Sequence, residues 1–388
     1  MTTELSEQAR GWLADLEARG RRRAPAATAV ADTRRVVRGG RTLVDFSSND
    51  YLGLSRDPGV TAAAEAALRR WGAGGGASRL ITGDHPEYAA LEAELAGLKG
   101  SEDAVVFGSG YLANLGLLPA LVDRHDLILA DKLNHACLVD GARLSGARVL
   151  RYPHGDLAAV RARLARYRHQ YRRCLIVSDG VFSMDGDLAP LGELAELATA
   201  FDAWLMTDDA HGVGVVGDGA GSTAAAGLTA AQVPLQMGTL SKAVGGYGGY
   251  LCTDRVVADY LRSRARSFIY TTALPPATVA GAAAAVHRIR TDPALCRRPL
   301  ALARRLSDRL GLAEPESPIV PVVLGRAQAA LEAQARLGEA GFLVQAIRPP
   351  TVPEGPARLR ITLRAPHTEA DVDALAEAVA PLLPRKAG

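Results

Sequence analysis

The sequence has few cysteines and no long apolar run. Its four cysteines are far apart and show none of the paired spacings of metal sites or disulfide frameworks. No stretch approaches the 18 or so uninterrupted apolar residues of a transmembrane helix, and the first seven residues already contain Glu4 and Glu7, unlike a secretory signal. We therefore expect reduced thiols, a cytoplasmic location and no membrane insertion.

A strong charge imbalance is also missing. The 45 basic and 42 acidic residues give a net charge of +3 over 388 residues, whereas a nucleic-acid-binding protein normally has a concentrated basic face. Arginines cluster at residues 21–23 and 161–173, and the second cluster fits the solvated side of a helix. Hydrophobic residues make up 48% and charged residues 22%, which is ordinary for a folded protein. We predict no nucleic-acid partner.

Short apolar runs alternate with helical patterns through the middle of the chain. Helix-like spacing occurs at residues 86–98 and 188–201, between strand-like runs at 104–107, 127–130, 148–150, 174–177 and 203–207. This alternation predicts an α/β protein with a mostly parallel sheet and helices on both faces.

Three parts are expected along the chain. A helix over residues 4–19 and a basic arm with a strand form an N-terminal part, residues 1–45. A large domain covers residues 46–280. Residues 281–388 form a small C-terminal α/β domain, with strands at 319–324, 343–347 and 358–363 and a closing helix from Thr368.

Polar residues and glycines follow the predicted strands of the large domain. They occupy residues 108–111, 131–135, 178–183 and 208–211. In a parallel α/β sheet, ligands bind beyond the carboxyl ends of the strands. The groups capable of chemistry are therefore expected at one edge of the sheet.

Lys242 follows an apolar run and precedes a glycine-rich turn. In such a position a lysine can be held still and shielded from water, which lowers its pKa and makes the amine able to form a Schiff base. The alternative is an ordinary lysine in a solvent-exposed loop.

Asp208 ends a buried strand, where an unpaired carboxylate is costly. A protonated pyridine nitrogen would be a suitable partner. The alternatives are a structural aspartate that caps a turn or pairs with arginine, and a metal site made of Asp208, Asp209 and His211. No further Glu/His motif completes that metal site.

Two glycine-rich segments are candidates for ligand contact. Ser109, Gly110 and Tyr111 precede a helical pattern, and backbone N–H groups at such a helix N-terminus bind phosphate. The glycines at residues 72–76 permit close approach to a ligand, although a flexible loop explains them as well. Residues 212–217 have the spacing of a dinucleotide-binding motif, but no helix start follows them, so we do not expect nicotinamide binding.

His135 lies just beyond a strand, at the same predicted edge. Its imidazole could stack on a planar cofactor or simply cap a helix. The local sequence favours neither function.

Four segments together resemble the α-oxoamine synthases. They read Asn-Asp-Tyr-Leu-Gly-Leu at 49–54, Ser-Met-Asp-Gly-Asp at 183–187, Asp-Asp-Ala-His at 208–211 and Thr-Leu-Ser-Lys at 239–242. The resemblance covers essentially the whole chain. Residues 346–353 and the arginines at 21–23 are most similar to the family member of the biotin pathway.

The resemblance implies a fold, a cofactor and a reaction. The fold is the type I fold of pyridoxal-phosphate (PLP) enzymes, with a seven-stranded, mostly parallel sheet in the large domain and active sites at the interface of a homodimer. The implied reaction is the decarboxylative condensation of L-alanine with a pimeloyl thioester, carried on coenzyme A or on acyl carrier protein. The alternative within the family is condensation of glycine with acetyl-CoA, or another reaction of this type.

The same resemblance assigns roles to individual residues. Lys242 would bind the cofactor covalently and transfer the proton at the amino-acid Cα, Asp208 would pair with the ring nitrogen, and His135 would stack on the ring. The remaining cofactor contacts would come from Ser109, Gly110, Tyr111, Ser183, His211 and Thr239, with Thr271 or Thr272 reaching the partner subunit's cofactor. Substrate contacts would come from Arg21, His135 and Thr351, and from Arg348 or Arg360 to a carboxylate. No metal site is expected.

Two readings from other classes are weaker. A PLP-binding protein without catalysis would release no thiol from an acyl-CoA. A hydrolase using Ser183 or Ser109 lacks the glycine pattern of a nucleophile elbow.

Overall fold

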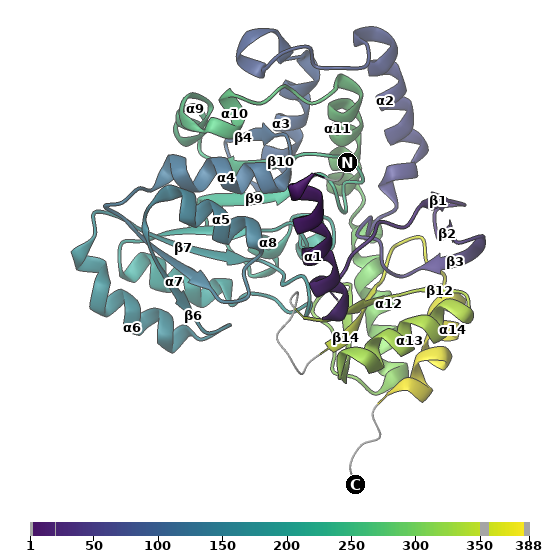
Figure 1. The fold of residues 1–388 in the computed structure, drawn as a ribbon. Coiled ribbons are helices and arrows are strands. Elements are labelled where there is room, and N and C mark those ends of the chain that lie inside the picture. The colour runs from purple at the N-terminus through teal and green to yellow at the C-terminus, as the bar shows by residue number, and fades with distance from the viewer. Residues whose placement is uncertain (1–2, 20, 350–356, 384–388) are drawn as a thin grey trace.

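The computed structural model describes residues 3–19, 21–349 and 357–383 (Figure 1). Its central element is a seven-stranded sheet. From β9 to β6 the neighbouring strands are parallel, whereas β10 runs antiparallel to both of its neighbours. The strand order is β4 (Asp103–Phe107), β10 (Gly249–Thr253), β9 (Leu235–Thr239), β8 (Trp204–Asp208), β7 (Cys174–Asp179), β5 (Leu127–Asp131), β6 (Arg148–Tyr152). The predicted α/β class with a mostly parallel sheet is confirmed.

Helices cover both faces of this sheet because alternate strand residues point to opposite sides. Leu175 and Val177 of β7 pack in one apolar cluster, and Cys174 and Ile176 pack in another. The first face is covered by α4 (Gly110–Leu121), α5 (Ala136–Ser145), α9 (Arg255–Arg264) and α10 (Arg266–Ile269). The second face is covered by α6 (Leu157–Tyr167), α7 (Leu191–Ala200), α3 (Pro86–Lys99) and α11 (Pro276–Thr291). The helix predicted from residue 188 begins later than expected, at Leu191.

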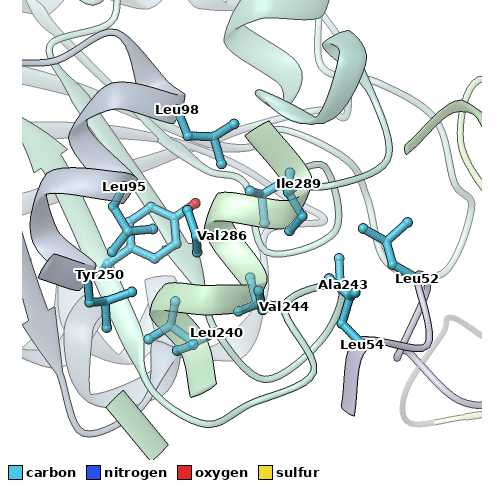
Figure 2. Close-up of a cluster of buried hydrophobic side chains, with 14 of the residues drawn as sticks. Leu52, Leu54, Leu95, Leu98, Leu240, Ala243, Val244, Tyr250, Val286 and Ile289 are labelled. Atoms are coloured by element: carbon cyan, nitrogen blue, oxygen red, sulfur yellow. The ribbon is translucent and has the colours of Figure 1, made fainter. Parts of the chain in front are cut away.

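The segment after β9 is anchored in the apolar cluster drawn in Figure 2. Leu240, Ala243 and Val244 are completely buried there, close to Val286 and Ile289 of α11. On its other side α11 packs against α2 (Pro58–Trp71). The backbone on both sides of Lys242 is thus fixed by burial.

The C-terminal part is built on a three-stranded antiparallel sheet. Its strands are β11 (Ile319–Gly325), β14 (Ala357–Thr362) and β13 (Gln345–Ile347), with β14 in the centre. Its core includes apolar residues of α12 (Pro293–Leu310), α13 (Ala327–Glu339) and α14 (Glu369–Val379).

A four-stranded sheet joins the two ends of the chain. It consists of β1 (Thr28–Val30), β2 (Arg35–Arg38), β3 (Arg41–Asp45) and β12 (Phe342–Leu343). The single strand predicted over residues 343–347 is therefore wrong, because these residues form two short strands in different sheets. The proposed boundary at residue 280 falls within α11, and the three-part division stays a prediction.

The remaining helices are short or peripheral. Helix α1 (Glu4–Ala18) has no buried residue and lies in front of the sheet in the view of Figure 1.

Within the described ranges, no helix combines the length and the apolar character needed to cross a bilayer. The short elements are η1 (Leu54–Arg56), η2 (Arg79–Gly83), η3 (Arg168–Gln170), η4 (Gly217–Gly219), α8 (Ser222–Ala225) and η5 (Ala380–Leu382).

Candidate active site

A cavity of about 320 Å³ opens at the carboxyl ends of the central strands. Asp179, Asp208 and Thr239 are the last residues of three neighbouring parallel strands and all line this cavity. This is the edge at which the sequence predicts the site. Nine predicted site residues line the cavity: Ser109, Gly110, Tyr111, His135, Ser183, Asp208, His211, Thr239 and Lys242.

The Lys242 amine is buried within the site. Its Nζ lies 2.8 Å from Nε2 of His211. Burial lowers the Lys242 pKa to about 8, although the negative charges of Asp208 and Asp179 partly oppose this effect. The lysine can therefore supply a neutral amine near physiological pH.

His211 is fixed from both ring nitrogens. Its Nδ1 lies 2.7 Å from the hydroxyl of Tyr51, and its Nε2 faces Lys242. Burial holds the pKa of His211 well below its usual value, and the charges of Lys242 and Arg360 add to this effect. The imidazole is thus neutral at physiological pH.

Asp208 is a buried carboxylate whose hydrogen bonds come from neutral donors. Asn114 Nδ2 donates to Oδ2 at 2.7 Å, and the backbone N–H of Ala210 donates to Oδ1 at 3.1 Å. Burial raises the pKa of Asp208, while the nearby charge of Lys242 lowers it. A cationic ring nitrogen in the cavity would compensate for this desolvation.

Asp209 points to a different partner. Its Oδ2 lies 2.7 Å from Nζ of Lys99, and both side chains are completely buried. The carboxylate also accepts hydrogen bonds from the backbone N–H of Ser222. A Cβ at Gly212 would lie 2.0 Å from Asp209 Oδ1, so part of the glycine-rich run at 212–217 makes room for this ion pair.

The turn before α4 has the features of an anion site. Ser109 caps the helix by accepting a hydrogen bond from the backbone N–H of Leu112. A Cβ at Gly110 would lie 3.3 Å from the side chain of Thr239, so the glycine lets the start of α4 lie close to the end of β9. The hydroxyl of Tyr111 donates to Asp140. Exposed N–H groups and the helix dipole favour a phosphate here.

His135 caps α5 and also lines the cavity. Its Nδ1 accepts a hydrogen bond from the backbone N–H of Cys137 at 3.3 Å, and the backbone N–H of His135 donates to Asp179 Oδ2 at 2.9 Å. The capping alternative is therefore right, and it does not exclude a second role. Burial lowers the pKa of His135, so a neutral ring is available for stacking. Stacking itself stays a prediction.

Ser183 belongs to a loop held by the C-terminal sheet. Arg360 Nε donates to the carbonyl oxygen of Ser183, and Arg358 pairs with Asp185. Arg360 is also buried beside the site, with its Nη1 3.1 Å from Asn49 Oδ1. Of the two candidate carboxylate-binding arginines, Arg360 is the one next to the site.

The other predicted residues lie elsewhere. Arg21 and Arg348 line a separate cavity of about 420 Å³ together with the neighbouring arginines of the N-terminal arm. Thr271 lies beside Gly108, and Thr272 pairs with Ser78, so neither lines the main cavity of its own chain. Thr351 lies outside the described residues.

Several lining or supporting residues were not predicted. Asp179 falls within the predicted polar segment 178–183 but was given no role, although it ends a buried strand as Asp208 does. Tyr51 lies in a quoted motif, but no sequence signal connects it to His211. Cys137 and Asn114 face the site from helices, and helical periodicity marks such residues as core.

Comparisons with known proteins agree with this geometry. The family model described as "Aminotransferase class I and II" matches residues 41–379. A putative 8-amino-7-oxononanoate synthase of Acidiphilium cryptum is 58% identical, over 97% of this chain and 98% of that protein. An 8-amino-7-oxononanoate synthase of Methylobacterium nodulans is 56% identical over 98% of both chains.

A solved structure agrees over nearly the full length. It is a serine palmitoyltransferase from S. paucimobilis with a bound PLP–myriocin aldimine, and it is 29% identical with a TM-score of 0.91 over 98% of both chains. Sequence and structure thus confirm the resemblance and the predicted fold. The chain belongs to the class I and II aminotransferase family and, within it, to the α-oxoamine synthases.

Proposed function

We propose that this chain is an 8-amino-7-oxononanoate synthase that uses PLP to condense L-alanine with a pimeloyl thioester. The products are 8-amino-7-oxononanoate, carbon dioxide and the free thiol of the acyl carrier. The observation that carries the proposal is the 56% identity, over 98% of both chains, to a protein of that name.

The residues of the cavity fit PLP. The N-terminus of α4 at Gly110, with Thr239 opposite, suits the phosphate. Asp208 suits the protonated ring nitrogen because it is a buried anion that accepts hydrogen bonds from neutral donors. Lys242 supplies the amine for covalent attachment. When bound, PLP withdraws electrons from the amino-acid Cα and so stabilises negative charge there.

The chain itself has to move the proton at Cα. Lys242 is the group suited to this task, because its pKa of about 8 allows the amine to accept and return a proton near neutral pH. His211 lies 2.8 Å away and orients the amine. The imidazole of His135 would cover one face of the ring.

Arginines are proposed to bind the two substrate carboxylates, that of alanine and that at the distal end of the pimeloyl group. Arg360 would bind the alanine carboxylate, because its guanidinium is buried beside the site and held by Ser183 and Asn49. Arg21 and Arg348 would bind the anionic distal end of the acyl donor, because the two cationic side chains line the same cavity. Thr351 belongs to the same proposal.

A homodimer and a cytoplasmic location complete the proposal. Large apolar side chains are exposed around η2, α5 and α10, where a second copy could cover them, and Thr271 or Thr272 would then reach the partner's phosphate group. All four cysteines are buried and free, as expected for a reducing compartment.

A substrate comparison tests the proposed function. Holoenzyme is given L-alanine with pimeloyl-CoA or with pimeloyl-acyl carrier protein, and in parallel glycine with acetyl-CoA. Thiol release and product mass are measured. We expect 8-amino-7-oxononanoate from at least one pimeloyl donor and no product with Lys242→Ala. Turnover restricted to glycine and acetyl-CoA would show a 2-amino-3-ketobutyrate ligase instead, and no thiol release from any donor would point to a non-catalytic protein.

A further inference from the structure

Asn114 contacts Asp208 from the helical layer, and no functional role has been assigned to it so far. It belongs to α4 and is completely buried. Its Nδ2 lies 2.7 Å from Asp208 Oδ2 and 3.1 Å from Sγ of Cys137. The amide nitrogen thus contacts the Asp208 carboxylate and the Cys137 thiol beside it.

Close packing of α4 against α5 creates this arrangement. A Cβ at Gly141 of α5 would lie 2.5 Å from the backbone oxygen of Asn114 and 2.9 Å from Leu118. The glycine lets the two helices approach each other. This approach places Cys137 of α5 beside the Asn114 amide, at the carboxyl end of β8.

The unpartnered half of the amide indicates what the residue is for. Asn114 Oδ1 is buried and has no hydrogen-bond partner among the described residues. An unsatisfied buried acceptor is destabilising. The donated hydrogen bond to Asp208 is therefore the feature of Asn114 that an apolar residue of the same shape could not replace.

The donated bond acts on the ionisation of the carboxylate. Burial works against the anion of Asp208, and the charge of Lys242 and the hydrogen bond from Asn114 work for it, in that order; a protonated His135 would add to them. Lys242 changes its own charge near neutral pH, whereas the amide of Asn114 is a constant donor. Other titratable groups facing Asp208 are Asp179 from β7, Cys137 from α5, and Tyr250 from β10.

We propose that Asn114 is a positioning residue that keeps Asp208 ionised and aimed at a cationic ring nitrogen in the cavity. The functional part of this proposal rests on the proposed PLP chemistry. The effect on Asp208 itself belongs to the cofactor-free chain, so it can be measured without substrate or turnover.

The experiment measures the titration of Asp208 by NMR in the full-length, cofactor-free protein labelled with [4-¹³C]aspartate. The Asp208 signal is assigned by its loss in Asp208→Asn. In Asn114→Leu, which has nearly the same shape but no donor, we expect the titration midpoint to rise by about 1–2 pH units, since a hydrogen bond to a charged group contributes about 1.5–3 kcal/mol. The matched control is Thr207→Val, because Thr207 precedes Asp208, is completely buried and has an unpartnered hydroxyl. Its midpoint should equal that of the wild type.

A second measurement uses the wild-type protein, so it does not depend on whether an Asn114 variant folds. In the wild-type chain, the side-chain ¹⁵N signal of Asn114 should shift with pH at the same midpoint as the Asp208 carboxyl. Equal Asp208 midpoints in wild type and Asn114→Leu would overturn the proposal, as would an equal shift in Thr207→Val or a pH-independent Asn114 signal. Failure of alanine and pimeloyl turnover would leave these NMR results unchanged, so the two proposals fail separately.

Discussion

Lys242 combines a fixed backbone with a buried, perturbed amine. Its neighbours Leu240, Ala243 and Val244 are fully buried in the apolar cluster, whereas the amine itself faces the cavity. The sequence could predict this lysine because an apolar run and a glycine turn surround it. Desolvation then makes the amine reactive near neutral pH.

Cofactor capture by the apo protein should follow the ionisation of Lys242. With a pKa of about 8, the neutral fraction rises about tenfold between pH 7 and pH 9, and the rate of covalent capture should rise with it. Stopped-flow absorbance after mixing with PLP measures this rate. In Asp208→Asn the midpoint should move to lower pH, because the carboxylate favours the ammonium form. A wild-type midpoint near the usual lysine value of 10.5 would contradict the proposed desolvation.

Other residues of the site could not be predicted from local sequence. Tyr51 meets His211 across 160 positions of chain, and Asn114 meets Asp208 across 94. Such pairs depend on how elements pack, and a single sequence contains no periodicity that reports it. Arg360 and Arg348 illustrate the same limit, because both are arginines of the C-terminal part and only the fold separates them.

At the scale of elements, the predicted strand runs match five of the seven strands of the large sheet but include neither β9 nor β10, and no strand order was predicted. Apolar runs with a polar residue at the end are readable, as at Asp179 and Asp208. The antiparallel insertion of β10 between β4 and β9 is not, since a strand buried on both faces has the same composition in either direction. The run at residues 343–347 was misread because its two halves pair with different sheets.

Close contact between α4 and α5 should depend on Gly141. Gly141→Ala places a methyl group against the Asn114 backbone and should destabilise the protein by about 1–3 kcal/mol, because the helices must separate. Gly192→Ala is the matched control, since nothing lies within 4 Å of its added Cβ and alanine favours α7 by up to about 1 kcal/mol. Thermal unfolding compares the two variants. A melting temperature of Gly141→Ala at or above that of the wild type would argue against tight packing here.

A charged histidine, His154, holds the loop that contains Ser183 through ion pairs. Nε2 of His154 lies 2.7 Å from Asp187, and Nδ1 lies 3.2 Å from Asp131 at the end of β5. These two hydrogen bonds raise the His154 pKa from 6.5 to about 10. Because the folded-state pKa is raised, the stabilisation is complete below about pH 6.5 and is lost as pH rises through about 10.

His154→Gln should therefore lower the melting temperature at pH 6 and approach the wild type at pH 10. The glutamine keeps hydrogen-bonding capacity but has no charge, so the difference isolates the cation. His169→Gln, at an exposed histidine of η3, serves as the control and should match the wild type at both pH values. A deficit of His154→Gln that is equally large at pH 6 and pH 10 would rule out a charge effect.

At the scale of the whole molecule, large apolar side chains are left exposed on or next to η2, α5 and α10. Ile81 of η2 is 74% exposed, Leu144 of α5 is 64% exposed, and Tyr270 after α10 is 72% exposed. Leu144 and Tyr270 line the same cavity of about 660 Å³, and η2 contacts α10. Exposed apolar patches of this kind mark protein interfaces. The patch adjoins Thr271, which the proposed dimer assigns to the partner's cofactor.

The double variant Ile81→Lys, Tyr270→Lys should convert the proposed dimer into monomers, because each change places a desolvated charge in the interface. Sedimentation velocity measures the mass, which for the wild type should be twice that of the 40.7 kDa chain. Val323→Lys, at an exposed apolar residue of β11 in the C-terminal sheet, is the control and should remain dimeric. The monomer should also bind PLP more weakly than Val323→Lys, because Thr271 or Thr272 of the second subunit would no longer reach the phosphate. A double variant that stays dimeric would place the interface elsewhere, and a monomer with unchanged PLP affinity would remove the two threonines from the cofactor site.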